Sequence, residues 1–189
     1  MFKNLFVLLF NIIVYPEKTW KKLIEETDVN NENFYKSYLY PVVGIIALLS
    51  FIGVLISIKQ FDVQLALKTV IKDILTYFAG FYLASFCLNK WLIPYFAKEE
   101  ARMILSERFT GYSSAVIYLA AMISALFPSL FFVQIAVLYS IYIIWKGTIY
   151  YLQIEESNWV KFTIFASILI IFTPFLVGTI ISFIMPGMK

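Results

Sequence analysis

Residues 112–145 read YSSAVIYLAAMISALFPSLFFVQIAVLYSIYIIW and contain no charged side chain. A bilayer's hydrocarbon core is crossed by about 20 helical residues, so this stretch is too long for one span of ordinary tilt. Pro128 and Ser129 lie near its middle, where proline ends a helix and favours a turn. The stretch therefore predicts a hairpin of two membrane-spanning helices.

Apolar runs on both sides of this hairpin complete a set of five predicted spans. The chain is 61% hydrophobic and only 14% charged, whereas a soluble domain is about half apolar and a quarter charged. We expect an all-α integral membrane protein, with a cytoplasmic N-terminal region over residues 1–37 and a five-helix transmembrane domain over residues 38–189. The predicted spans are residues 39–58, 74–96, 111–127, 129–152 and 162–185.

The distribution of basic residues predicts the orientation, because positively charged loops stay in the cytoplasm. Eleven basic residues fall on the N-terminal side of the five spans and four on the opposite side. We therefore expect a cytoplasmic N-terminus and an extracytoplasmic C-terminus. The first group is Lys3, Lys18, Lys21, Lys22, Lys36, Lys90, Lys98, Arg102, Arg108, Lys146 and Lys161; the second is Lys59, Lys68, Lys72 and Lys189.

Three segments between or before the spans have helical patterns of their own. Residues 1–14 are apolar apart from a narrow stripe at Lys3, Asn4 and Asn11, and are too short to span, which predicts an amphipathic helix in the membrane interface. Residues 64–72 are amphipathic and are expected to lead into the second span. Residues 97–110 mix acids, bases and apolar side chains, which predicts a surface helix, either a solvated connection, which this pattern favours, or a docking surface for a partner.

The residues that usually carry catalysis are scarce. The chain has no histidine and one cysteine, Cys87, inside an apolar run, and its acids lie outside or at the edges of the apolar runs. No phosphate-binding loop or metal-ligand spacing occurs. We therefore predict no catalytic residue, no cofactor, no metal and no enzymatic activity; a serine–lysine pair of Ser113 or Ser114 with Lys146 is the one arrangement that would change this. A net charge of +3, dispersed between apolar runs, gives no reason to expect nucleic-acid binding.

Polar residues within the predicted spans support two readings. Lys90 and Lys146 lie near the cytoplasmic ends of their spans and can extend to the membrane surface. Alternatively, Asn89, Lys90, Gln134 and Lys146 converge on a cytoplasm-open polar vestibule. Small residues predict close helix packing or contacts with other membrane proteins or a second copy; they are Ser50, Gly53 and Ser57, then Gly80 and Ala84, and Ala120, Ala121, Ser124 and Ala125.

Several short motifs give the chain a family resemblance. They are Tyr15-Pro16-Glu17-Lys18-Thr19-Trp20, Tyr40-Pro41, Gly111-Tyr112-Ser113-Ser114, and Leu138-Tyr139-Ser140-Ile141-Tyr142 with Gly147. In this order they resemble prokaryotic members of the YIP-type family, which is related to eukaryotic Ypt/Rab-interacting membrane proteins. The resemblance implies five helices with a cytosolic N-terminus. Eukaryotic relatives bind prenylated Rab GTPases and take part in vesicle budding.

Two functions are therefore carried forward. The first is a non-enzymatic protein of the bacterial inner membrane that organises the bilayer or binds partners. The alternative is a small-molecule or lipid transporter with its vestibule near Lys90 and Lys146. The first predicts no polar cavity, and the second predicts that the four vestibule residues meet. The bacterial assignment follows from a composition rich in lysine, isoleucine, phenylalanine and asparagine with little arginine.

Overall fold

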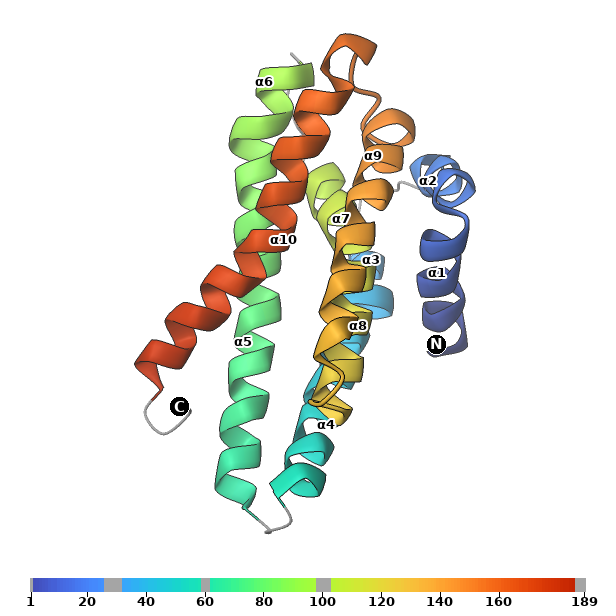
Figure 1. The fold of residues 1–189 in the computed structure, drawn as a ribbon. Helices are drawn as coiled ribbons and strands as arrows, with labels where there is room; N and C mark the ends of the chain where they lie inside the picture. The colour runs from blue at the N-terminus through green and yellow to red at the C-terminus, as the bar shows by residue number, and fades with distance from the viewer. Residues whose placement is uncertain (1, 26–31, 59–61, 98–102, 186–189) are drawn as a thin grey trace.

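The computed structural model describes residues 2–25, 32–58, 62–97 and 103–185, and in these ranges the chain forms helices and no strands (Figure 1). Within them, four helical segments are long and apolar enough to cross a membrane, and a bent pair of helices makes a fifth if it is one span. The all-α membrane bundle predicted from the sequence is confirmed.

The helices follow one another through short connections. Three segments deviate from α-helical geometry: η1 and η2 are π-helical, and η3 is a 3₁₀-helix of unusual length. The bounds are α1 Phe2–Val14, α2 Pro16–Glu25, α3 Glu32–Phe34, η1 Tyr35–Leu39, α4 Tyr40–Ile58, α5 Val63–Cys87, η2 Leu88–Leu92, α6 Ile93–Ala97, α7 Met103–Ser113, α8 Ala115–Leu126, η3 Phe131–Tyr139, α9 Ser140–Tyr150, η4 Glu156–Asn158 and α10 Trp159–Ile184.

The predicted hairpin is present. Helix α8 ends at Leu126 and η3 begins at Phe131, with a turn between them in which the Leu130 N–H donates to the Phe127 carbonyl at 2.9 Å. The amphipathic stretch 64–72 is the first part of α5, as expected. That helix begins one residue after Asp62, whose side chain accepts from the Leu65 N–H at 2.9 Å and caps the first turn.

The predicted surface helix over residues 97–110 is wrong in the part that the structure describes. Residues 98–102 lie outside the described residues, but α7 is buried from Ser106 onward, and the Arg108 and Glu107 side chains are buried as well. Helices α7 and α8 meet at an angle of 44°. The charged residues of this segment predict contact with solvent. Phe109, however, is fully buried in the core, and Glu107 and Arg108 beside it in α7 are buried too.

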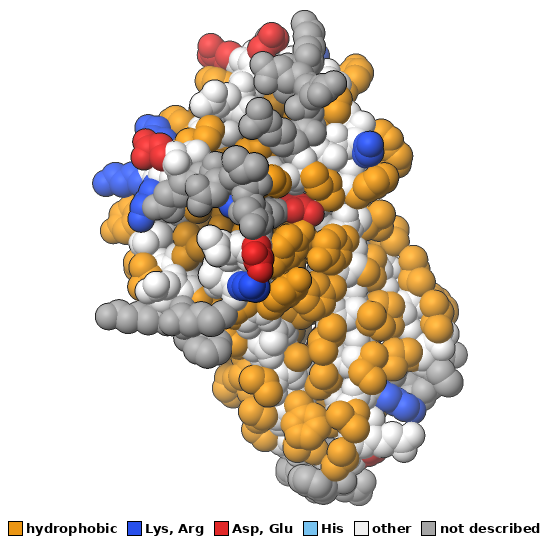
Figure 2. Space-filling view, turned by 180° about the vertical axis from the view of Figure 1, so that it is seen from behind, with side chains coloured by type: hydrophobic (Ala, Val, Ile, Leu, Met, Phe, Trp, Pro, Cys, Tyr) orange, Lys and Arg blue, Asp and Glu red, His pale blue; other side chains and the backbone are white. Residues whose placement is uncertain are grey.

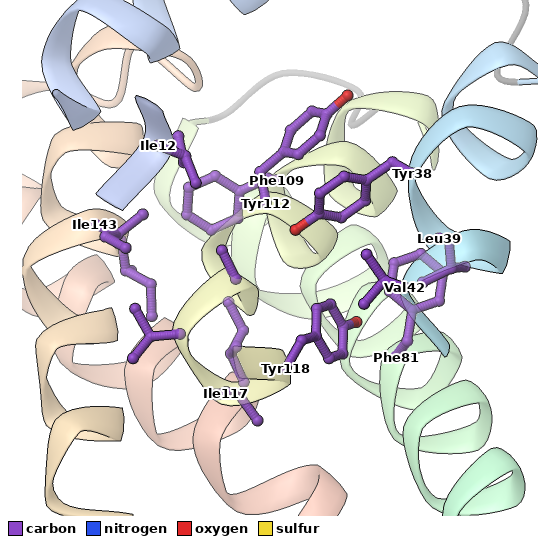
Figure 3. Close-up of a cluster of buried hydrophobic side chains, with 14 of the residues drawn as sticks. Ile12, Tyr38, Leu39, Val42, Phe81, Phe109, Tyr112, Ile117, Tyr118 and Ile143 are labelled. Carbon is purple, nitrogen blue, oxygen red and sulfur yellow. The ribbon is translucent and has the colours of Figure 1, made fainter. Parts of the chain in front are cut away.

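A cluster of buried aromatic side chains joins the N-terminal region to the transmembrane helices (Figure 3). Trp20 of α2 is fully buried, lies 5.6 Å from the Phe109 ring and 5.0 Å from the Tyr151 ring, and donates from its indole N–H to the Ile143 carbonyl at 3.0 Å. Tyr38 donates to the Gly111 carbonyl at 3.1 Å. The N-terminal helices therefore share one core with the bundle.

Helix α1 is the predicted short apolar N-terminal helix. Leu5, Leu9 and Ile12 are buried against the molecule, whereas Phe6 and Phe10 on the other face are exposed. Figure 1 shows α1 below α2 and roughly parallel to the long axis of the bundle rather than across its end, and α1 contacts α8. Its exposed face therefore continues the apolar surface of the neighbouring spans.

The two ends of the bundle differ in charge. We call the end formed by α2, η2 and the start of α10, at the top of Figure 1, the basic end; it carries Lys18, Lys21, Lys90 and Lys161. The opposite end, where α4 leads into α5, is the far end. Figure 2 shows a broad hydrophobic surface below a region in which most of the visible charged side chains gather. This distribution is the one that a membrane-spanning bundle requires.

Two predicted small-residue positions bring helices into close contact. A Cβ on Gly53 of α4 would meet the Ala125 carbonyl oxygen of α8 at 1.8 Å, and one on Gly80 of α5 would meet Pro174 of α10 at 3.0 Å. The packing interpretation is confirmed for both glycines. Because they contact helices of the same chain, their close approaches serve the bundle itself.

Candidate functional site: a lateral cavity between α5, α10 and η3

A cavity of about 950 Å³ lies between α5, α8, η3, α9 and α10. Its size is near the upper end of the range for small-molecule sites. Apolar walls come from Ile117, Val137, Ile141, Ile168, Ile171 and Phe172, and polar groups from Asp73, Thr76, Tyr77, Gln134, Ser167 and Thr179. The cavity thus combines apolar and polar surfaces. This differs from the membrane-organising hypothesis as the sequence gives it, because that hypothesis predicts no polar cavity.

The local helix geometry explains why a cavity forms here. Helix α10 passes close to α5 at Pro174 and then leans away from the η3 side of the bundle (Figure 1). On that side, η3 has no buried residue. The 3₁₀ geometry turns its side chains differently from an α-helix, so η3 does not pack closely against α10. Exposed residues such as Phe172 and Ile141 belong to the cavity lining, so the cavity reaches the apolar surface of the protein.

Asp73 is a charged residue of α5 that lines this cavity. It was expected at the edge of the second span, but α5 begins at Val63, so Asp73 lies about 15 Å along the helix from its start. The Ser50 hydroxyl, in the middle of α4, donates to its Oδ2 atom. Asp73 is at the edge of the apolar run that begins at Ile74, but it lies in the interior of helix α5. The helical pattern of residues 64–72 continues into the apolar run without a break, and this pattern indicates that Asp73 belongs to the interior of the helix.

Two buried hydroxyl groups belong to residues that line the cavity, but they lie at different levels: Thr76 faces Gly178 of α10, and Ser167 lies eleven residues earlier in that helix, about 16 Å away along its axis. Thr76 and Ser167 line the cavity, are 8% and 4% exposed, and their hydroxyls have no hydrogen-bond partner in the described part of the chain. Other helical threonines satisfy their hydroxyls locally; Thr69 donates to the Leu65 carbonyl at 3.0 Å and Thr179 to the Phe175 carbonyl at 2.9 Å. A buried hydroxyl left without a partner costs about 1–3 kcal/mol, and such hydroxyls also occur outside the cavity, at Ser85, Ser113 and Ser140.

The four residues predicted to form a vestibule have separate surroundings. Gln134 lines the cavity and donates to the Ser124 hydroxyl at 3.0 Å. Lys146 lies 3.3 Å from a Glu17 oxygen of α2, while Lys90 is exposed on η2 and Asn89 is half-buried beside it. Among the described residues, none of the four forms a hydrogen bond or ion pair with another of the four.

Glu17 is the centre of a charged group at the basic end. Its carboxylate accepts from Lys21 at 2.8 Å as well as from Lys146, and hydrogen bonds from Lys21, then Tyr150 and Lys146, lower the pKa of Glu17 to about 2. The Lys146 ammonium also lies 5.6 Å from the centre of the Tyr150 ring. This lysine therefore fastens α2 to α9.

Among the described residues, no hydrogen bond joins Ser113 or Ser114 to Lys146. Ser114 donates to the Thr110 carbonyl at 2.8 Å, so its hydroxyl is directed along its own helix, and Lys146 is paired with Glu17. Within the described ranges, no group of three His, Cys, Asp or Glu side chains is placed to hold a metal ion. The lateral cavity is accordingly the candidate functional site.

Comparison with known proteins gives a single positive result. The model of the Yip1 domain matches residues 10–186, nearly the whole chain. No curated protein and no solved structure matches. The matched range includes the motifs at Tyr15, Gly111 and Leu138, and the helical membrane bundle agrees with it. The chain therefore belongs to the Yip1 domain family.

Proposed function

We propose that this protein is a non-enzymatic membrane protein that organises the surrounding bilayer by holding a membrane lipid in the lateral cavity. The observation that carries the proposal is the combined lining of that cavity. Ile168 and Phe172 offer an apolar wall for an acyl chain, while Asp73 offers a polar group for a headgroup. A membrane lipid has both parts, and it is present around the protein at high concentration.

A lipid reaches this cavity without leaving the bilayer. The exposed lining residues Ile141 and Phe172 lie on the apolar outer surface of α9 and α10, where acyl chains surround the protein. The exposed Phe6 and Phe10 of α1 extend the same kind of surface on another side of the bundle. That second surface suits bilayer contact or docking of another membrane protein, as expected for a protein that organises its surroundings.

The test is to fill the cavity and count the lipids that stay with the purified protein. Thr179 lines the cavity, and its neighbour Ile180 on α10 is exposed and does not line it. We expect Thr179→Trp to abolish most of the lipid retained in native mass spectrometry, whereas Ile180→Trp retains the wild-type amount. Equal retention by the two variants would show that the bound lipid lies elsewhere, and would contradict the proposal.

A second candidate function is movement of lipid between the leaflets, and the placement of Asp73 favours it. Ionisable residues within membrane spans mark substrate or ion paths more often than structural positions. The cavity lining runs from Ser167 to Ser182 on α10, about 22 Å at 1.5 Å per residue. This candidate predicts that the protein accelerates exchange of a labelled lipid in vesicles and that Thr179→Trp slows it; binding without exchange would support the first proposal alone.

A further inference from the structure

A second, smaller cavity lies in the corner between α1 and α2, and we infer that it binds the phosphate of an anionic phospholipid. This corner cavity has a volume of about 290 Å³. Residues of both helices line it: Leu8, Asn11 and Tyr15 of α1, and Lys18, Thr19, Lys22 and Leu23 of α2. None of these residues lines the lateral cavity, so this site is independent of the function proposed above.

The charge of the corner cavity is positive. Lys18 and Lys22 both line it, are exposed, and lie one helical turn apart on α2, so they share a face of that helix. Lys18 forms no ion pair with any described residue, and the described lining contains no carboxylate. The adjacent carboxylate of Glu17 is paired with Lys21 and does not line the cavity. The corner cavity therefore favours a negatively charged ligand group.

The α1 wall of the corner cavity adds a hydrogen-bond donor. Asn11 is half-buried in this wall, and its side-chain amide has no hydrogen-bond partner among the described residues. Lys18 reaches toward the same wall, since its ammonium lies 5.8 Å from the centre of the Tyr15 ring. An amide N–H and an ammonium both donate to phosphate oxygens, and the bonds from the ammonium are charge-assisted. The two helices thus present donors to one small space.

The corner is held in place by bonds within the protein. The Tyr15 carbonyl accepts from the Thr19 N–H at 3.0 Å and from the Thr19 hydroxyl at 2.9 Å, which joins the end of α1 to the first turn of α2. The next residue, Trp20, is fully buried and donates to the Ile143 carbonyl at 3.0 Å. Because the walls are already ordered, binding a ligand here costs little conformational entropy.

The position of the corner makes a phospholipid the source of the phosphate. Helix α1 runs roughly parallel to the long axis of the bundle and meets α2 at the basic end, so the corner lies where the apolar surface gives way to charge (Figure 1). Val7 is half-exposed one turn before Asn11, on the same face of α1, and Leu8 lines the cavity itself. An acyl chain can therefore lie along α1 while its phosphate meets the lysines. A zwitterionic headgroup would bring its own ammonium toward them, which favours an anionic lipid.

The experiment measures the headgroup preference of lipid added to the purified full-length protein. Phospholipids with glycerol and with choline headgroups and identical acyl chains are added in equal amounts, and bound lipid is counted by native mass spectrometry. We expect the anionic glycerol lipid to be enriched. Lys18→Gln and Lys22→Gln should each lower the glycerol-to-choline ratio about fivefold, the effect of one basic residue at an anionic membrane surface. The matched control Lys161→Gln removes an exposed charge from the same end, outside both cavities, and should leave the ratio unchanged.

Three results would overturn the inference. The first is a ratio that is the same in wild type, Lys18→Gln and Lys22→Gln. The second is an equal decrease in the Lys161→Gln control, because net charge alone would then explain the preference. The third is loss of the Lys18 effect when Thr179→Trp fills the lateral cavity, which would assign the preference to that cavity.

Inorganic phosphate distinguishes a lipid from a soluble ligand at the same site. We expect excess inorganic phosphate to leave the glycerol lipid bound, because phosphate alone makes no contact with the apolar surface of α1. Displacement of the lipid in wild type by inorganic phosphate would show that the corner binds free phosphate, and would contradict the assignment to a phospholipid.

Discussion

The core at the basic end and the cavity beside η3 are built from similar amino acids but packed in opposite ways. At the basic end, Trp20, Phe109 and Tyr151 are almost completely buried and their rings lie within 6 Å of one another in two of the pairs. Beside the cavity, η3 has no buried residue and Phe172 and Ile141 of its lining are exposed. Both regions are rich in aromatic and aliphatic side chains, so composition alone does not distinguish them.

The difference shows how one small bundle combines rigidity with space for a ligand. The aromatic core fixes α2, α7 and α9 relative to one another, while the close approaches at Gly53 and Gly80 fix α4 against α8 and α5 against α10. With these helices held, α10 can lean away after Pro174 and leave a cavity without loss of the fold. We therefore expect stability to depend mainly on the basic end and ligand binding mainly on the cavity.

The largest expected effect is at Trp20. Trp20→Ala removes a fully buried indole and its hydrogen bond to the Ile143 carbonyl, and should lower the free energy of unfolding by about 3–5 kcal/mol. The exposed tryptophan Trp91 is the control, since Trp91→Ala should change it by less than about 0.5 kcal/mol. Unfolding in detergent measures both, and equal effects would show that the aromatic core does not dominate stability.

The next effect compares two isoleucines of α9. Ile143 is fully buried at the aromatic core, whereas Ile141 lines the cavity and is 40% exposed. Ile143→Ala should cost about 2–5 kcal/mol and Ile141→Ala less than about 1 kcal/mol, because only the first leaves a closed void. A cost at Ile141 as large as that at Ile143 would mean that the cavity is closed by packing in the folded protein.

A smaller effect is expected at the contact between α4 and α8. Gly53→Ala places a methyl group on the Ala125 carbonyl oxygen, so one helix must shift, at a cost of about 1–3 kcal/mol. Gly44→Ala in the same helix meets no atom within 4 Å and should be neutral or slightly stabilising. Thermal unfolding of the two variants compares them directly; a tolerated Gly53→Ala would mean that the two helices are not in fixed contact.

The smallest effect concerns pH at the basic end. The lowered pKa of Glu17, about 2 against an ordinary value of 4.5, means that its ionised form stabilises the folded state. This contribution is complete above pH 4.5 and is lost as the pH falls toward 2. Glu17→Gln should therefore unfold at a lower temperature than wild type at pH 7, with the difference shrinking below pH 4.5. A difference that is constant with pH would show that the carboxylate charge has no part in holding α2.

The fold was predictable from the sequence in most of its elements because length and apolar content decide a membrane span. The hairpin at Pro128, the amphipathic start of α5 and the short apolar α1 all follow from local patterns, and the structure has them. The family followed from short motifs, and the Yip1 domain match confirms it. The burial of α7 was not predictable in this way, because its position depends on Trp20, which is distant in sequence.

The candidate site was less predictable, since a cavity depends on where helices do not pack. Of the four residues proposed for a vestibule, Gln134 lines the cavity, whereas Lys146 is paired with Glu17 at the basic end. Apolar content alone predicts that the second span begins at Ile74, after the last charged residue, whereas the helix begins at Val63 and therefore has Asp73 in its interior. The 3₁₀ geometry of η3 could not be predicted either, because no pattern in its mostly apolar sequence distinguishes a 3₁₀-helix from an α-helix.

An experimental structure of the protein in lipid nanodiscs tests the central claim most directly. The account predicts elongated lipid density between α10 and η3, with its polar end at Asp73 and its chain against Phe172. Direct packing of α10 side chains against η3, with no space for a lipid between them, would contradict it.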